Sequence, residues 1–170
     1  MTSPDGRHQT HTGLYTTAQR ARRDATVWTV IQGILAPVQF VVFLISLGLV
    51  VRYLSTGEGY AIATLSIIVK TGCLYLIMVT GAIWEKIVFG QYLFAPAFFW
   101  EDVFSFAVIA LHSAYLWALW AGTLSPHELM WLALAAYAAY VINAVQFVLK
   151  LRAARLQAMD APSGQSEIAA

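Results

Sequence analysis

Four long apolar stretches constrain the fold of this chain more than any other feature of its sequence. Each is long enough to form a helix that crosses the hydrocarbon core of a membrane, which takes about 20 residues. Strands are not expected, because apolar and polar residues do not alternate along these stretches. Charged residues make up only 11% of the chain, whereas a soluble domain carries about a quarter. The sequence therefore predicts an all-α polytopic membrane protein, an antiparallel bundle of four transmembrane helices at about 27–51, 60–83, 98–121 and 128–149.

The basic residues that flank these stretches predict the orientation of the bundle. Lysine and arginine concentrate in cytoplasmic loops, and most of those here lie near the chain ends or in the second connector: Arg20, Arg22, Arg23, Lys86, Lys150, Arg152 and Arg155. The opposite side carries only Arg52. Both termini are therefore predicted to be cytoplasmic. The polar stretches 1–17 and 159–170 are predicted to be disordered tails around a single domain, 18–158.

The stretch from Gly81 to Val103, GAIWEKIVFGQYLFAPAFFWEDV, is an unusual connector between two membrane helices. Most connectors between helices are short, small and polar, whereas this one is rich in aromatic and charged residues. Its acidic residues follow tryptophans, in Trp84-Glu85 and in Trp100-Glu101-Asp102. We therefore predict that this connector forms one wall of a reaction site.

Several polar side chains lie inside the predicted helices, where they must face protein or water. Gln32 and Asn143 fall in the half nearer the termini, level with the acidic residues of the connector. We expect these groups to line a pocket that opens toward the cytoplasm or the inner leaflet. Lys70 and His112 lie deeper, and each could serve the site or only hydrogen-bond a neighbouring helix. For His112 the structural role is favoured, because no second ligand follows at helical spacing.

Three carboxyl groups at one level, those of Glu85, Glu101 and Asp102, indicate acid–base chemistry. Crowding and burial favour the neutral form of a carboxyl group, so one of them could act as a general acid. The sequence contains no motif for metal hydrolysis, redox cofactors or nucleotides, and its single Cys73 builds no disulfide framework. Its net charge of +1 gives no support for nucleic-acid binding. Acid–base chemistry on a lipophilic substrate remains, or binding of a pigment or lipid without chemistry.

The chain closely resembles the 3-vinyl bacteriochlorophyllide hydratase family of anoxygenic phototrophs in four segments: WTVIQGILAPVQF, LVVRYLSTGEGY, MVTGAIWEKIVFGQYLFAPAFFWEDVFSFAVIALH and YVINAVQFVLKLRAARLQA. The resemblance covers Ala18 to Ala158 nearly continuously. It implies that water is added across the 3-vinyl group of a chlorophyllide-type macrocycle, giving a 3-(1-hydroxyethyl) group. This is a step of bacteriochlorophyll a biosynthesis, in a multi-pass protein of the bacterial inner membrane. The resemblance implies no cofactor, because the magnesium belongs to the substrate.

That reaction gives each candidate residue an expected role. Protonation of the terminal vinyl carbon would leave a cation conjugated with the macrocycle, to which water adds. We expect Glu101 or Glu85 to supply the proton, and Asp102 to hold the water or stabilise the cation. Substrate binding is expected from an aromatic and polar set: Gln91, Asn143, Gln32, Trp84, Trp100, Tyr92, Arg23 and His112. The propionate would meet Arg22, Arg23 or Lys150, and His112 could ligate the substrate magnesium.

A second interpretation is a pigment-binding or assembly module that hands chlorophyllides between pathway enzymes without chemistry. Such a module would need His112 and the aromatic residues but not the three carboxyl groups. Either interpretation implies a tetrapyrrole ligand and membrane lipid as partners, and leaves room for contacts with other enzymes of bacteriochlorophyll biosynthesis.

Overall fold

The computed structural model describes residues 14–160, of which 154, 155 and 157–160 are described by their backbone alone. This part of the chain forms five helices: α1 (Thr17–Ala25), α2 (Val27–Thr56), α3 (Tyr60–Phe89), α4 (Phe99–Ala121) and α5 (Pro126–Asp160). None of these residues forms a strand. Residues 1–13 and 161–170, which make up most of the two predicted tails, lie outside the described residues.

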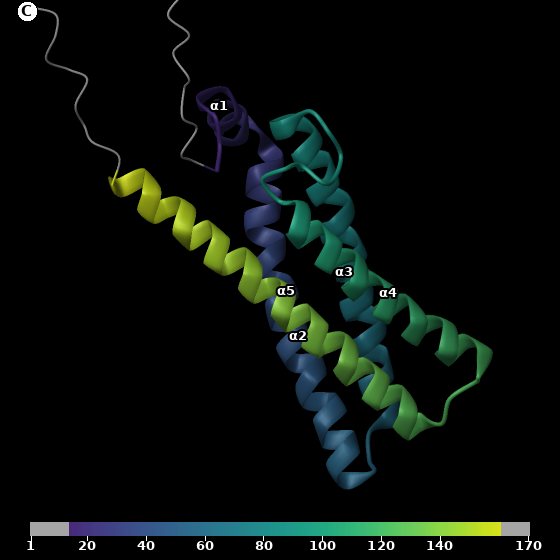
Figure 1. Cartoon of the computed structure of the whole chain (residues 1–170). Helices are drawn as coiled ribbons and strands as arrows, with labels where there is room; N and C mark the ends of the chain where they lie inside the picture. The colour runs from purple at the N-terminus through teal and green to yellow at the C-terminus, as the bar shows by residue number, and fades with distance from the viewer. Residues whose placement is uncertain (1–13, 161–170) are drawn as a thin grey trace, which may run out of the picture.

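Helices α2 to α5 are long and apolar enough to cross a membrane, which confirms the predicted all-α membrane fold. Many of their exposed side chains are large and apolar, including Val30, Ile34 and Leu65, because lipid surrounds a spanning helix. Figure 1 shows that successive spans run in opposite directions. Helix α1, the α3–α4 connector and the C-terminal part of α5 lie at one end of the bundle, which we call the α1 end.

Helix boundaries follow local sequence signals. Helix α2 ends at Gly57, whose φ of 75° is a left-handed conformation that suits glycine, and whose N–H donates to the Tyr53 carbonyl at 2.8 Å. Helix α5 begins with a capping box, in which the Ser125 N–H donates to Glu128 Oε2 at 2.8 Å and the Glu128 N–H donates to Ser125 Oγ at 3.4 Å. Thr16 and Gln19 cap α1 in the same reciprocal way.

Helix α3 extends further than predicted, and this moves part of the candidate site from the connector onto a helix. This helix was predicted to end near Ile83, but it continues to Phe89 and so includes Trp84 and Glu85. No glycine or proline interrupts the chain until Gly90, whose φ is 89°. Helices α2 and α5 also continue past the predicted ends at 51 and 149, because a helix does not need to stop where its apolar residues stop.

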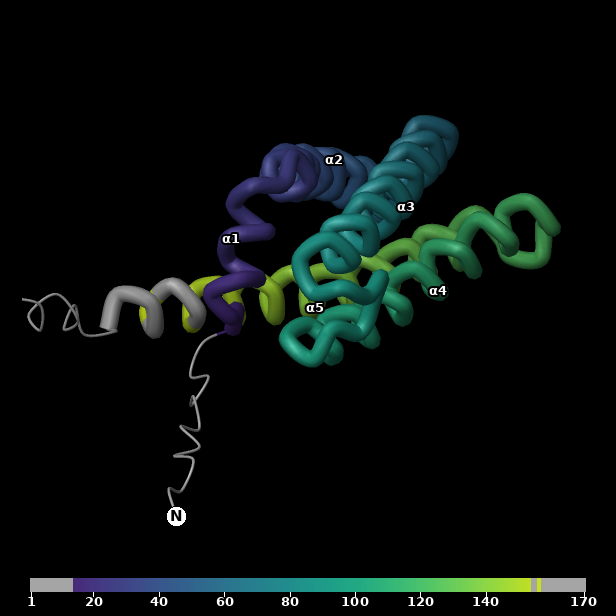
Figure 2. Tube along the Cα trace, turned by 90° about the horizontal axis from the view of Figure 1, so that it is seen from above, coloured from purple at the N-terminus to yellow at the C-terminus, as the bar shows by residue number. Residues whose placement is uncertain are grey.

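The helices pair as two hairpins, α2 with α3 and α4 with α5, seen from above in Figure 2. The buried apolar core joins the hairpins toward the end opposite α1, through residues such as Phe43, Ile67, Tyr115, Met130 and Tyr137. The core therefore leaves the α1 end of the bundle to polar and aromatic groups.

Hydrogen bonds between side chains also tie the spans together. Ser46 bonds both Ser66 and Tyr137, with oxygens 2.7 Å and 2.6 Å apart, and so joins α2 to α3 and to α5. Tyr75 on α3 reaches Ser113 on α4 at 2.7 Å. Inside a membrane such bonds are worth on average about 0.6 kcal/mol each, so the set holds the hairpins in register more than any single bond does.

Lys70 and His112 meet in the middle of the bundle, and both side chains are fully buried. Lys70 Nζ lies 2.9 Å from His112 Nε2 and 4.0 Å from the centre of the Tyr140 ring. His112 Nδ1 donates to the Val108 carbonyl at 2.8 Å, so its Nε2 accepts from the lysine. This arrangement favours a structural role for both residues, as a link between α3 and α4.

Candidate active site

A pair of carboxyl groups forms the centre of the candidate site. Glu85, in the last turns of α3, and Asp102, in the first turn of α4, lie within hydrogen-bonding reach of each other. Both are buried, with exposed fractions of 6% and 3%. A carboxylate can only accept hydrogen bonds, so the two groups can bond each other only with a proton on one of them. Their arrangement is therefore suited to holding a proton at a site shielded from water.

The α3–α4 connector is fastened to this pair by its backbone. The Phe94 N–H donates to Asp102 Oδ2 at 2.7 Å, and the Ala95 N–H donates to Glu85 Oε2 at 3.4 Å. Phe94 adopts a φ of 59°, a left-handed conformation that is uncommon for a residue other than glycine. Strained backbone of this kind persists where surrounding contacts enforce it, and here both hydrogen bonds involve carboxyl groups of the candidate site.

Glu101, beside Asp102 in the sequence, makes a different contact. Its Oε2 lies 2.6 Å from Lys150 Nζ of α5, in an ion pair whose side chains are 9% and 27% exposed. The same ammonium group lies 5.1 Å from the centre of the Phe98 ring. This contact commits the Glu101 carboxyl group to an ion pair with α5, a role distinct from proton donation.

A hollow of about 530 Å³ opens at the α1 end. Helices α1, α3 and α5 and the connector line it with Leu14, Thr16, Gln19, Phe89, Pro96, Ala97 and Lys150. Small-molecule sites span about 300 to 1,000 Å³, so the hollow has the volume of a ligand site. Two of its lining residues adjoin acidic residues of the site. Phe89 lies one helical turn from Glu85, and Lys150 pairs with Glu101.

Phe89, which lines this hollow, belongs to a cluster of aromatic rings. Tyr15 stacks on Phe89 with ring centres 5.7 Å apart, and Phe98 stacks on Phe147 at 5.9 Å. Trp84 meets Phe98 edge to face, also at 5.9 Å. Flat rings at these spacings form an apolar surface that suits a flat conjugated ligand.

Tyr15 is a member of this cluster that the sequence analysis missed, because it assigned residues 1–17 to a disordered tail. The guanidinium carbon of Arg23 lies 4.9 Å from the centre of its ring. Burial raises the pKa of the Tyr15 hydroxyl, and the nearby Arg23 opposes this only in part, so the ring stays neutral near neutral pH. The capping pattern of Thr16 and Gln19 was the available signal that order begins here.

Several residues predicted to bind substrate are held by other contacts near the pair. Trp84 Nε1 donates to Thr29 Oγ1 at 2.9 Å, and Gln32 Nε2 donates to Thr80 Oγ1 at 2.6 Å. Asn143 Nδ2 donates to Ser105 Oγ at 2.9 Å. These bonds place the three side chains at the α1 half of the bundle, as predicted from their positions along the helices.

Other predicted residues do not converge on the pair. Tyr92 and Trp100 are 61% and 67% exposed on the outside of the connector and of α4. Gln91 is also exposed, and its Nε2 donates to the Leu93 carbonyl at 3.1 Å. His112 lies ten residues beyond Asp102 along α4, about 15 Å at the helical rise, and both its ring nitrogens have protein partners.

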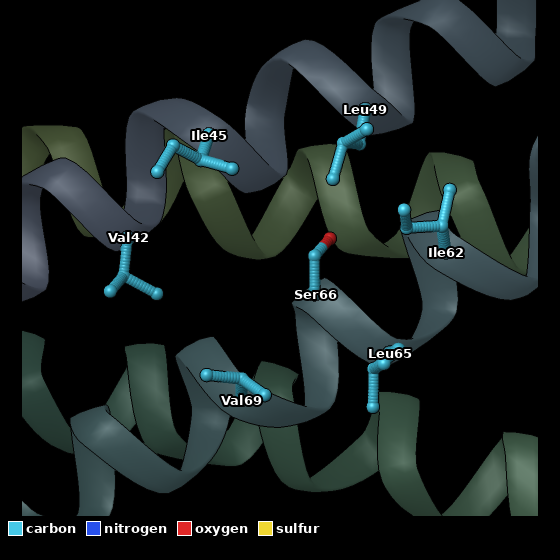
Figure 3. A pocket seen from close by; sticks show the side chains of 7 residues that line it. All are labelled: Val42, Ile45, Leu49, Ile62, Leu65, Ser66 and Val69. Atoms are coloured by element: carbon cyan, nitrogen blue, oxygen red, sulfur yellow. The ribbon is translucent and has the colours of Figure 1, made fainter.

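A second hollow, of about 280 Å³, lies between α2 and α3 and is shown in Figure 3. Its lining is apolar except for Ser66, whose hydroxyl is already bonded to Ser46 and to the Ala63 carbonyl. The hollow therefore offers no group for chemistry, and the candidate site is the one at the α1 end. Within the described residues, no three histidine, cysteine or acidic side chains cluster as metal ligands would.

Comparisons with known proteins agree on one family. The family model of 2-vinyl bacteriochlorophyllide hydratase matches residues 15–153. A 2-vinyl bacteriochlorophyllide hydratase from Cereibacter sphaeroides is 75% identical over 147 residues, 86% of this chain and 91% of that protein. A protein of the same name from Rhodobacter capsulatus is 69% identical over 152 residues, 89% of this chain and 88% of that protein. No solved structure matches the chain.

Proposed function

Because the chain belongs to the 2-vinyl bacteriochlorophyllide hydratase family, we propose that it adds water to the vinyl group of a bacteriochlorophyllide-type macrocycle. The locants 2 and 3 denote the same vinyl group in two numbering schemes of the macrocycle. The observation that carries this proposal is the buried Glu85–Asp102 pair. It supplies what hydration of an alkene needs first, a carboxyl proton held in place away from bulk water.

The reaction then needs two steps. The Glu85 carboxyl group gives its proton to the terminal vinyl carbon, which leaves a positive charge on the inner carbon, delocalised into the macrocycle. The oxygen of a water molecule forms a bond to that inner carbon, and one of the water protons returns to the Glu85 carboxylate. Asp102 remains a carboxylate throughout, orients Glu85 and stabilises the cation. The balance is one vinyl group and one water consumed for each 1-hydroxyethyl group formed.

The helix ends favour Glu85 over Asp102 as the proton donor. A helix C-terminus carries partial negative charge and a helix N-terminus partial positive charge. Glu85 stands near the C-terminus of α3, where its neutral form is favoured, whereas Asp102 stands at the N-terminus of α4, where its anion is favoured. Asp102 also accepts the shorter backbone bond, 2.7 Å against 3.4 Å. Glu101, the other predicted donor, instead serves the ion pair with Lys150.

The macrocycle would lie in the aromatic hollow at the α1 end, against Tyr15, Phe89 and Phe98. Its vinyl edge would point toward Glu85, and a carboxylate substituent would meet Arg23 at the rim. The remaining predicted binding residues, Gln91, Tyr92, Trp100 and His112, would act at most at the periphery. The carboxyl pair lies beneath the connector, so the connector would have to shift for the vinyl group to reach Glu85.

We propose no cofactor beyond the substrate, because acid-catalysed hydration moves only protons and water, and the magnesium arrives with the macrocycle. The distribution of basic residues supports an orientation with both termini in the cytoplasm, in the inner membrane of a bacterium. Substrate and product are both lipophilic, so lipid and neighbouring enzymes of the same pathway are the expected partners.

One experiment separates this function from pigment handoff without chemistry. The purified full chain in detergent is incubated with chlorophyllide a in ¹⁸O-labelled water, and the pigment is analysed by mass spectrometry. A hydratase yields a pigment heavier by one labelled water. Pigment that binds stoichiometrically but keeps its mass would overturn the hydratase proposal and support the handoff module.

A further inference from the structure

Three buried amide oxygens accept no hydrogen bond from any residue that the structure describes: Gln39 Oε1, Asn143 Oδ1 and Gln146 Oε1. Buried acceptors in proteins are almost always paired with a donor, from protein or from ordered water. Three such atoms on two neighbouring helices are therefore an unusual group, and each needs a partner that donates a hydrogen bond.

Contacts across α4 and α5 place two of these amides beside the carboxyl pair. Lys150 of α5 meets Glu101, and Asn143 of α5 meets Ser105. Gln146 lies between Asn143 and Lys150 on the same face of α5. Because the two helices are antiparallel, Gln146 stands at the level between Glu101 and Ser105, which is the level of Asp102.

The third amide, on α2, lies deeper in the bundle. The Phe43 ring packs on Tyr140 with ring centres 4.9 Å apart. Gln39 lies one turn from Phe43 toward the α1 end, and Asn143 lies about one turn from Tyr140 in the same direction. Gln39 is only 3% exposed, so its side chain is enclosed within the bundle. Gln32, two turns nearer the α1 end of α2, bonds Thr80 of α3, so Gln39 lies farther from the α1 end than the carboxyl pair does. Asn143 and Gln146 are therefore the two unpaired amides at the level of the pair.

We propose that Asn143 and Gln146 form the water site of the reaction, which rests on the proposed hydratase function. Water is the small molecule that can donate two hydrogen bonds inside so enclosed a space. A water that donates both hydrogens to amide oxygens turns the lone pairs of its oxygen away from the amides. In this proposal the amides lie on one side of the water and the carboxyl pair on the other. The lone pairs of the water then face the position of the vinyl cation. The amides thus orient the nucleophile, and the carboxyl pair handles the proton.

The test uses methanol as a competitor for water. Wild type and the near-isosteric variants Gln146→Met and Asn143→Leu are given chlorophyllide a in water–methanol mixtures, and the 1-hydroxyethyl and 1-methoxyethyl products are quantified. A site that holds water by its two hydrogens rejects methanol, which has one. We expect the variants to shift the product ratio toward the ether by about tenfold, as loss of one ordinary hydrogen bond would give. The KM for pigment should stay unchanged.

The ratio does not depend on how much enzyme is active, so partial unfolding does not mimic the effect. Thr64→Val, at the far end of α3, is the matched control and should keep the wild-type ratio. Variants with the wild-type ratio and the wild-type kcat would overturn the water site but leave the hydratase intact. A wild type that adds neither water nor methanol would instead overturn the proposed function.

A second measurement covers variants that lose all turnover. Radiolytic hydroxyl labelling modifies side chains beside water molecules held inside a protein, and thermal unfolding in detergent shows whether each variant is folded. Folded wild type should be labelled at the level of Tyr140 and Asn143, and folded Gln146→Met should lose that labelling. Absence of the labelling in wild type would overturn the water site.

Discussion

The buried carboxyl groups of Glu85 and Asp102 lie within hydrogen-bonding reach of each other, although they stand on different helices and 17 residues apart. They meet because α3 continues six residues past its predicted end and because the connector folds back over both side chains. The contact lies at the opposed ends of two helices, whose partial charges favour opposite states for the two groups. The predictions below follow from this arrangement and from its neighbours.

The Glu101–Lys150 ion pair should stabilise the bundle without taking part in proton transfer. Lys150→Met leaves the Glu101 carboxylate buried without its partner, which should lower the free energy of unfolding by about 1–3 kcal/mol. Glu101→Gln combined with Lys150→Met should recover most of that loss, because no unpaired charge remains. Unfolding of the four proteins of this cycle in detergent gives the coupling between the two side chains. Single and double variants of equal stability would show that the pair contributes nothing.

Phe94 should carry backbone strain that glycine relieves. Phe94→Ala and Phe94→Gly both remove the ring that stacks on Phe106 at 5.5 Å, but only glycine adopts a φ of 59° without a steric penalty. Phe94→Gly should therefore be more stable than Phe94→Ala by about 1 kcal/mol. Thermal unfolding of the two variants checks this, since they differ in one methyl group. If the alanine variant were at least as stable as the glycine variant, Phe94 would not hold a strained left-handed conformation.

Lys70 should act in packing and not in the reaction. Lys70→Met keeps the volume of the side chain and removes its bond to His112, and exchange of a buried charge for an apolar group of similar size is often tolerated. We expect unchanged kcat and KM with a modest change in thermal stability. Lys70→Glu, which buries a negative charge at the same place, should fail to fold. A folded methionine variant without turnover would instead assign Lys70 a part in the chemistry.

Tyr15 should bind the macrocycle through its ring and not through its hydroxyl. Tyr15→Phe keeps the stack on Phe89 and should leave the KM for pigment near that of wild type. Tyr15→Ala removes the ring and should raise the KM by about tenfold, the worth of one aromatic contact, with kcat unchanged. Steady-state kinetics at several pigment concentrations separate the two constants. Equal KM values for all three proteins would show that Tyr15 does not contribute to pigment binding.

The sequence was sufficient for the helices and for the level of the polar groups, because apolar length and chain direction fix both. It did not reveal which carboxyl groups meet. The Glu85–Asp102 contact depends on the end of α3 and on a left-handed Phe94, which no local pattern favours at a phenylalanine. The partner of Glu101 was equally hidden, since Lys150 and Arg152 lie near the same level of α5. The place of Tyr15 could have been found, because Thr16 and Gln19 form a readable helix start.

The most direct test of the central claim compares Glu85→Gln with Glu101→Gln in single-turnover hydration of chlorophyllide a in ¹⁸O-labelled water. Glu58→Gln, an exposed acidic residue in the α2–α3 turn, serves as the control. If Glu85 supplies the proton, Glu85→Gln binds pigment but loses about 10² to 10⁴ in rate, the contribution of a general acid, and Glu101→Gln keeps most of its rate if folded. Wild-type turnover by a folded Glu85→Gln variant would contradict the account.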